Sequence, residues 1–168
     1  MKHFLKKAQS GMTMVEILLY LALLSILVFV LTDMLISILS TRLESESYAT
    51  VEQDGRFLLT RLEYDIPQAS SISQPPSLGA TTSALVMVVN GVTYTYQASG
   101  SSLALTNNNG TDMLQSSETS ISALSFFRLG NPSGKDTIQV QFTLTGKTQR
   151  TGTGVGDSQT FSTTVSRR

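Results

Sequence analysis

The sequence predicts an α+β fold in which one long N-terminal helix packs, by its second half, against an antiparallel β-sheet. Residues 12–54 contain no proline or glycine and begin with a twenty-residue apolar run. Residues 51–66 then carry apolar side chains at helical spacing. Residues 70–168 instead alternate short β-rich runs with turn residues. A helix with one apolar stripe and a sheet with one apolar face bury them against each other, so a layered arrangement is expected.

The composition excludes several classes of site. The 168 residues include 12 Lys and Arg and 12 Asp and Glu, so no basic excess favours nucleic-acid binding. Cysteine is absent, which excludes disulfides, thiolate metal sites and cysteine nucleophiles. The single histidine, His3, lies beside the N-terminus, so imidazole chemistry is not expected in the body of the chain. We therefore expect no catalytic residues, no enzymatic activity and no cofactor.

The N-terminal segment combines a basic leader with an apolar run. The leader, residues 1–11, has three basic charges and no acid: Lys2, Lys6 and Lys7. Met12–Leu31 contains three clearly polar side chains: Thr13, Glu16 and Ser25. As a helix this run would be about 30 Å long, which matches the hydrocarbon core of a bilayer. Lysines before the run and none within it predict a cytoplasmic leader and an exported remainder.

Two ordinary interpretations of this segment are a secretory signal peptide and a plain single-span anchor. The apolar run is long for a signal peptide, and no small-x-small cleavage pattern directly follows Leu31. Glu16 argues against both. An acid at the centre of a span costs about 2.5–3.5 kcal/mol on insertion scales, less nearer the interface, and it usually has a partner or a function.

The residues around Glu16 carry a family resemblance. The run Gly11-Met12-Thr13-Met14-Val15-Glu16-Ile17-Leu18 resembles the type IV prepilin signature, which is Gly, usually Phe, then Thr-Leu-x-Glu and an apolar run. Gly11, Thr13, Glu16 and the apolar run match it, and so does the basic leader. Met12 and Met14 stand where Phe and Leu are commonest, and both keep the bulk and the apolar character.

The resemblance implies processing followed by assembly. A prepilin peptidase would cut between Gly11 and Met12 and leave a free, often N-methylated, amine on Met12. The mature chain would then carry 9 basic and 12 acidic side chains. In filaments of this family the acid at the position of Glu16 pairs with a neighbour's N-terminal amine, so each charge compensates the other in a low-dielectric bundle. Glu16 would thus set the axial register, and residues 12–40 would be the transmembrane half that becomes the filament core.

Residues 41–66 are predicted to continue the helix as an amphipathic segment facing the domain core. The stripe consists of Val51, Gly55, Leu58, Leu62 and Ile66. Pro67 predicts a helix end near residues 64–66, and Gly55 could mark a bend. The run 56–69 is similar to the end of the first helix in minor pilins and J-type pseudopilins, and Asp33 stands where major pilins often have proline. The resemblance therefore favours a minor subunit.

Residues 41–168 are expected to form the exported globular domain, with its β-sheet within residues 84–166. The predicted strands form an antiparallel meander: Ala84–Val89, Val92–Gln97, Ser102–Thr106, Ile121–Leu129, Thr137–Thr145 and an edge strand, Gln159–Ser166. Asn90-Gly91 predicts a type I′ hairpin turn. The glycines within residues 146–158 predict a mobile loop.

The exported domain contains polar, aromatic and basic residues that could serve a ligand site. Asn107, Asn109 and Asp112 could offer oxygen ligands to Ca²⁺, which some pseudopilins bind, but their spacing does not match a calcium loop, and a polar hairpin turn is the preferred interpretation. The aromatic residues are interpreted as core: Tyr94, Tyr96, Phe126, Phe127 and Phe161. The basic residues that could gather into a DNA-binding patch are interpreted as solvated surface: Arg128, Lys135, Lys147, Arg150, Arg167 and Arg168.

The resemblance implies a minor pilin or pseudopilin, which primes, caps or modulates a type IV pilus or a type II secretion pseudopilus. Its implied partners are other pilins or pseudopilins, the prepilin peptidase, an inner-membrane assembly platform and membrane lipid. One span would hold it in the inner (cytoplasmic) membrane, with the domain outside, before it joins a periplasmic or extracellular filament. Three alternatives stay open: a DNA-uptake (competence) minor pilin, a pilus-tip adhesin, and a membrane-anchored exported β-rich domain unrelated to filaments.

Overall fold

The computed structural model describes residues 13–130, 134–149 and 156–168. The chain divides into two compact units, Met1–Thr41 and Arg42–Arg168, and helix α1 (Met14–Asp65) contributes to both. The predicted helix end near residues 64–66 is confirmed. At Ile66 the α-helix gives way to a short 3-10 helix, η1 (Ile66–Gln68), which contains Pro67. Proline has no N–H to donate and disfavours helical backbone at the residue before it, so the α-helix stops there.

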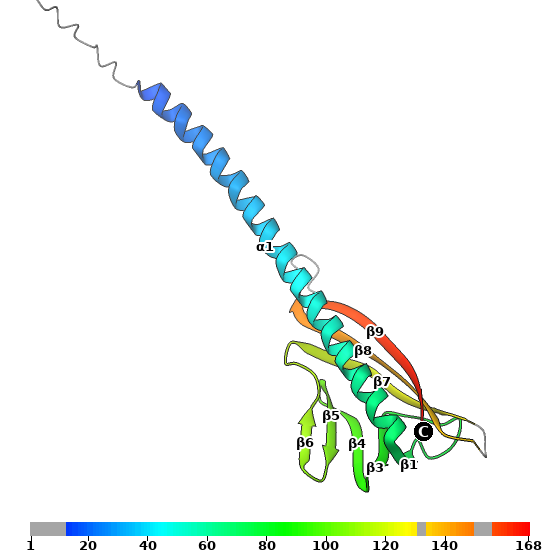
Figure 1. Ribbon diagram of the computed structural model, residues 1–168. Helices are drawn as coiled ribbons and strands as arrows, with labels where there is room; N and C mark the ends of the chain where they lie inside the picture. Colours follow the sequence, from blue (N-terminus) through cyan, green and yellow to red (C-terminus); the bar gives the residue numbers. More distant parts are fainter. Residues whose placement is uncertain (1–12, 131–133, 150–155) are drawn as a thin grey trace, which may run out of the picture. The chain divides into compact units, whose positions relative to one another are not determined.

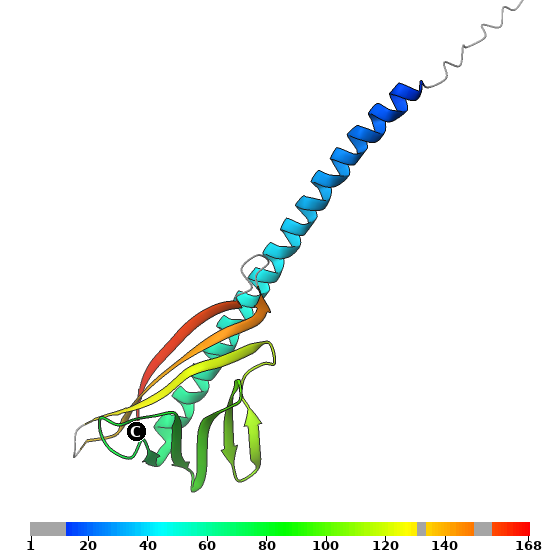
Figure 2. The ribbon, with the colours of Figure 1, turned by 180° about the vertical axis from the view of Figure 1, so that it is seen from behind.

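The unit Arg42–Arg168 contains two antiparallel sheets. A five-stranded sheet has the order β1-β3-β4-β5-β6, and a four-stranded sheet has the order β2-β7-β8-β9. The strands are β1 (Ala69–Gln74), β2 (Thr81–Thr82), β3 (Ala84–Val89), β4 (Val92–Ser99), β5 (Ser102–Asn107), β6 (Gly110–Met113), β7 (Thr119–Leu129), β8 (Thr137–Gln149) and β9 (Gly156–Ser166). In Figures 1 and 2 the green end of α1 lies along both sheets.

The predicted α+β class is confirmed, with one correction to the sheet. The strands form two sheets instead of a single meander, because β7 pairs with β2 and β8 and does not extend the β3–β6 ladder. The six predicted strands correspond to β3, β4, β5, β7, β8 and β9, and β9 is an edge strand as expected. Strands β1, β2 and β6 were not predicted.

The hairpin between β3 and β4 forms as predicted. Asn90 and Gly91 both have positive φ angles, 51° and 79°, as a type I′ turn requires at its two central positions. The turn sets the register, with Val89 opposite Val92 and Leu85 opposite Tyr96. Alternate residues of β3 therefore face the core, where Leu85, Met87 and Val89 are buried.

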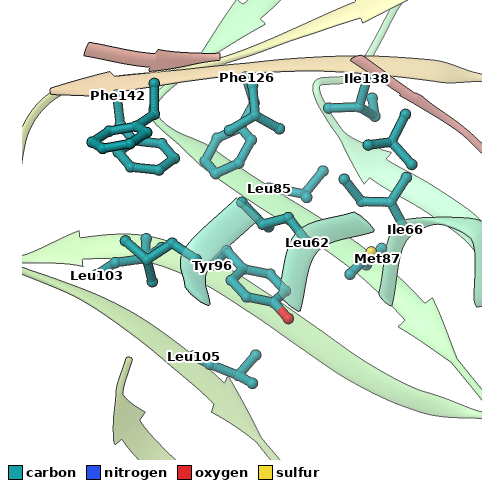
Figure 3. Close-up of a cluster of buried hydrophobic side chains, with 14 of the residues drawn as sticks. Leu62, Ile66, Leu85, Met87, Tyr96, Leu103, Leu105, Phe126, Ile138 and Phe142 are labelled. Carbon is teal, nitrogen blue, oxygen red and sulfur yellow. The ribbon is translucent and has the colours of Figure 1, made fainter. Parts of the chain in front are cut away.

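The hydrophobic core is built from the helix and from both sheets. The whole predicted stripe from Val51 to Ile66 is buried, including Gly55. The predicted alternation of β8 is confirmed, since one face of the strand is fully buried: Ile138, Val140, Phe142 and Leu144. Figure 3 shows Leu62 and Ile66 among side chains from both sheets, with Phe126 on one side and Tyr96 on the other.

Two glycines of this unit permit close packing. At Gly55 of α1, an added Cβ would lie 2.2 Å from Cζ of Phe161, so the aromatic ring rests on the helix backbone. At Gly146 an added Cβ would lie 2.4 Å from Oγ of Ser47.

The loop predicted over residues 146–158 is shorter in the structure, because buried Gly146 lies within β8 and β9 begins at Gly156. Residues 150–155 of that prediction lie outside the described residues.

Candidate functional site: the apolar helix of residues 14–41

The first unit exposes an apolar helix on all sides. Every residue from Met14 to Leu39 is solvent-exposed in the single chain, and Phe29, for example, is 74 % exposed. By length and composition this helix could cross a membrane. Soluble proteins rarely expose contiguous apolar patches larger than a few hundred Å², so a surface of this kind indicates contact with lipid or with other proteins.

Two hydroxyl groups in the middle of this segment are satisfied within the helix itself. Ser25 and Thr32 donate to the carbonyl oxygens of Leu21 and Val28, both at 2.8 Å. In an apolar surrounding an unsatisfied polar group costs several kcal/mol, so these internal bonds remove an obstacle to burial. The charged side chains that remain between Met14 and Leu39 are those of Glu16 and Asp33.

Glu16 lies in the first turn of α1, next to a capping residue. The N–H of Glu16 donates to Oγ1 of Thr13 at 3.3 Å, and the N–H of Ile17 donates to the carbonyl of Thr13 at 3.2 Å. Thr13 is therefore the N-cap, and Glu16 has the spacing of the acid in a capping box. An acid near a helix N-terminus gains about 0.3–1 kcal/mol from the helix dipole. That gain is smaller than the cost of burying the charge alone, so a buried Glu16 would still need a partner.

The processing residues of the prepilin interpretation cannot be located in the structure. Gly11, Met12 and the leader lysines Lys2, Lys6 and Lys7 all lie outside the described residues. The sequence pattern alone therefore carries their assignment. Thr13 is the first described residue, and it adds a structural role, that of helix N-cap, to its match with the prepilin signature.

The predicted calcium candidates lie in and beside the hairpin turn that joins β5 and β6. Oδ1 of Asn107 accepts a hydrogen bond from the N–H of Asn109 at 2.8 Å, which is the geometry of an Asx-turn. Asn107 pairs with Gly110 across the hairpin, and Asp112 pairs with Leu105. The hairpin-turn interpretation of these residues is confirmed. Within the described residues, no group of three or more His, Cys, Asp and Glu side chains lies together as a metal site.

Two of the predicted basic residues contact the same acid, Asp136, within the domain. Arg128 donates from Nη2 to Oδ1 of Asp136 at 2.8 Å and from Nη1 to the carbonyl of Pro75 at 2.9 Å. Arg167 also contacts Asp136, with 3.7 Å between Nη2 and Oδ2. Asp136 thus partly compensates the positive charge of Arg128 and Arg167, which weakens the attraction of these two side chains for a phosphate backbone. Arg150 lies outside the described residues.

The prediction that the aromatic residues lie in the core is confirmed for three of the five. Tyr94 is partly buried and packs against the core, and Phe127 is partly buried but is not part of the core cluster. Tyr96, Phe126 and Phe161 are buried. The hydroxyl of Tyr96 donates to Oδ2 of buried Asp65, and Nε of Arg61 donates to the same oxygen at 2.7 Å. Burial, together with the hydrogen bond to Asp65, raises the pKa of the Tyr96 hydroxyl above its ordinary value. This cluster fixes the last turn of α1 to strand β4.

A second polar contact anchors the middle of the helix. Oδ2 of Asp54 accepts hydrogen bonds from the hydroxyls of Ser116 and Thr119 at 2.7 and 2.6 Å, and from the N–H of Ser116 at 3.2 Å. Sequence reasoning missed this contact and the bond from Tyr96 to Asp65, whereas the pair of Arg61 and Asp65 follows from its i,i+4 spacing on the helix. The partners are separated by 31 to 65 residues along the chain, and no local pattern connects them.

Comparison with known proteins adds no identification, because no family model, no curated protein and no solved structure matches this chain.

Proposed function

We propose that this chain is a minor pilin or pseudopilin, a structural subunit of a type IV pilus or a type II secretion pseudopilus. After cleavage between Gly11 and Met12 it would prime, cap or modulate the filament. Residues 12–40 would hold the precursor in the membrane and then pack among the equivalent helices of neighbouring subunits. The unit Arg42–Arg168 would be the exported domain.

The observation that carries this proposal is the apolar helix that bears one acid at its start. Its side chains are exposed around the whole circumference from Met14 to Leu39, which suits a helix surrounded by lipid or by other helices. Glu16 lies in the first turn of the helix, and Asp33 lies about 25 Å further along it, at the far edge of a hydrocarbon core. A plain anchor gains nothing from Glu16, whereas a filament subunit uses it.

The charge balance explains what Glu16 would do. The free amine of a processed Met12 is positive, and Glu16 follows it by four residues on the same helical face. In a packed bundle, a lone buried charge is costly and a paired one is tolerated. The amine of one subunit and Glu16 of the next therefore compensate each other at one axial offset, which makes the pair a register device.

The alternatives have less support. A DNA-uptake role needs free basic side chains, and two of the six basic candidates are bound to Asp136. An adhesin needs a recognition surface for a host ligand, and the strand edges offer no specific indication of one. A membrane-anchored domain unrelated to filaments leaves Glu16 and the basic leader without a common explanation.

The N-terminal mass of the purified protein tests the proposal. The chain should be isolated from its native membrane, or from a host that expresses a prepilin peptidase. We expect a chain that starts at Met12 and is one methyl group heavier than its sequence, and a Gly11→Leu variant that stays full length. A wild-type chain that starts at Met1, or beyond Leu31, would overturn the proposal, and so would a Gly11→Leu variant that is still cut after residue 11.

A further inference from the structure

The chain contains two Asn-Gly pairs, and each lies at the tip of a hairpin. Asn90-Gly91 joins β3 to β4, and Asn109-Gly110 leads into β6. All four residues are exposed, and a Cβ added at either glycine would meet nothing within 4 Å, so water reaches both pairs. Within the described residues, the side-chain amides of Asn90 and Asn109 form no hydrogen bond. The proposed function uses neither pair.

An asparagine that precedes glycine loses ammonia without an enzyme. The backbone nitrogen of the glycine attacks Cγ of the asparagine, and the new C–N bond closes a succinimide ring. The side-chain nitrogen leaves as ammonia and takes the proton of the glycine N–H. Water then opens the ring at one of its two carbonyls and gives aspartate or isoaspartate. One water is consumed, one ammonia is released, and nothing is oxidised or reduced. The reaction therefore needs a glycine nitrogen that is free to attack.

The turn between β3 and β4 leaves that nitrogen free. Val89 lies opposite Val92, so Asn90 and Gly91 are the two central residues of a four-residue turn. In a β-turn the carbonyl of the first residue accepts a hydrogen bond from the N–H of the fourth. Gly91 is the third residue, and its N–H has no part in this bond. The nucleophile for ring closure at Asn90 is therefore available in the folded protein.

The turn between β5 and β6 places its glycine one position later. Asn107 lies opposite Gly110, so Gly110 is the fourth residue of this turn and its N–H is at the position that closes it. Asn109 is held as well, because its own N–H donates to Oδ1 of Asn107 at 2.8 Å. Ring closure at Asn109 thus requires the turn to open first.

We infer that Asn90 is the deamidation site of the folded protein and that the β5–β6 turn protects Asn109. The sequence alone ranks the two sites equally, since both are Asn-Gly. Opening the turn bond at Gly110 makes the reaction at Asn109 about two- to tenfold slower than at Asn90. The inference is independent of the proposed filament role.

The two products at residue 90 should differ in stability. Aspartate before glycine is itself favoured in a type I′ turn, so the aspartate product keeps the hairpin. Isoaspartate continues the chain through its side-chain carbonyl and adds one methylene to the backbone. The loop is then longer than the two residues that fix the register, in which Leu85 lies opposite Tyr96 in the core. The isoaspartate product is therefore the one that destabilises the domain.

Mass spectrometry of chymotryptic fragments tests the inference, because cleavage after Tyr96 separates the two sites. The uncleaved full chain, purified in a nonionic detergent, is kept at mildly alkaline pH, in one sample folded and in another unfolded by guanidinium chloride. Conversion is followed as the mass change from an amide to a carboxyl group. In the folded chain we expect Asn90 to convert about two- to tenfold faster than Asn109. In the unfolded chain, where both turns are lost, the two rates should be similar.

Asn90→Asp is the matched control. It keeps the turn, has no amide to lose at residue 90, and should leave conversion at Asn109 unchanged. Its unfolding midpoint in denaturant should exceed that of the isoaspartate product, which is recognised because a protease that cuts before aspartate does not cut before isoaspartate. Conversion at Asn109 as fast as at Asn90 in the folded chain, or an unchanged Asn90 after a time that converts the unfolded chain, would overturn the inference. None of these results bears on cleavage at Gly11.

Discussion

The ring of Phe161 lies directly on the backbone of Gly55, so close that a methyl group added at Gly55 would be 2.2 Å from Cζ of the ring. The contact joins the edge strand β9 to the middle of the core-facing helix. It also explains why a residue that weakens helices occupies this buried position. Phe161 stacks in turn on Phe142 of β8, with 5.6 Å between the ring centroids. The glycine therefore makes room for a pair of stacked aromatic rings.

Gly55→Ala should therefore destabilise the domain, although alanine is the better helix former. Alanine favours the helix by about 1 kcal/mol relative to glycine. Its methyl group, however, overlaps with Phe161 and forces the ring to shift, which costs about 1–3 kcal/mol or more. Denaturant unfolding followed by circular dichroism measures the net change. Gln53→Ala, an exposed position of the same helix, is the matched control and should be neutral or slightly stabilising. A Gly55→Ala protein more stable than the wild type would contradict the packing described here.

The cluster of Tyr96, Asp65 and Arg61 predicts a loss of stability at alkaline pH. The pKa of Tyr96 is raised in the folded state, so above about pH 10 the unfolded chain releases this proton while the folded chain retains it. The folded state then binds more protons, and the free energy of unfolding falls as pH rises, by up to about 1.4 kcal/mol per pH unit.

Tyr96→Phe should remove that alkaline slope. At neutral pH it should also cost about 1.5–3 kcal/mol, because buried Asp65 loses a hydrogen bond to its charged carboxylate. Urea unfolding at pH 7 and at several values above 9 measures both effects. Tyr64→Phe, at a tyrosine that is 65 % exposed, should change neither quantity. An equal slope in Tyr96→Phe and the wild type would mean that another group controls alkaline unfolding.

Arg128→Lys should destabilise the domain by about 2 kcal/mol, although it keeps the charge. The guanidinium donates to Asp136 from both Nε and Nη2, and it reaches two backbone carbonyls, those of Ile72 and Pro75, from Nη1. A lysine cannot reproduce this fork, and the pair is mostly buried. Thermal and denaturant unfolding measure the loss. Lys135→Arg, an exposed basic position nearby in the chain, serves as the control, and equal losses in both variants would refute the role of the fork.

Glu16→Ala should leave cleavage largely intact and impair assembly. Within a bundle it would leave a neighbour's amine buried without a counter-charge, and such a loss typically costs about 3–5 kcal/mol. The measurement is the fraction of the chain that is recovered in sheared filaments, compared with the membrane fraction of the native host. Glu16→Gln tests whether charge or shape matters, and Asp33→Asn should have a small effect. Wild-type incorporation of Glu16→Ala would remove the register role.

Some of this architecture can be read from local patterns. The helix end at Pro67, the buried stripe from Val51 to Ile66 and the Asn90-Gly91 hairpin follow from rules that act over a few residues. β6 begins with a glycine and contains an aspartate, and β1 is rich in serine, so neither has the composition of a strand. These two strands form because a neighbouring strand, β3 or β5, offers backbone groups for hydrogen bonding. Alternation shows which face of a strand is buried but not which strand lies beside it, which is why the second sheet was missed.

The functional residues, too, separate into those that a local pattern reveals and those that only the fold brings together. The apolar run and Glu16 are visible in the sequence because they are contiguous. The N-cap role of Thr13 could have been predicted from its spacing to Glu16, since a threonine three residues before a glutamate is the capping-box pattern. The contacts of Asp54 and the burial of Ser47 could not be predicted, because they depend on residues brought together by the fold.

The place of β9 in the domain sets the order in which the domain can mature. Thr163 of this strand donates to Glu63, one hundred residues earlier, and the N–H of Arg168 donates to the carbonyl of Pro67. Because a chain is synthesised from its amino end, Gly55 is exposed long before Phe161 is made and can pack on it. Contacts between residues so far apart in the chain slow folding, and they leave the part of the helix around Gly55 uncovered until β9 has been synthesised. A nascent or truncated chain without β9 is thus expected to be a substrate for holding chaperones and proteases.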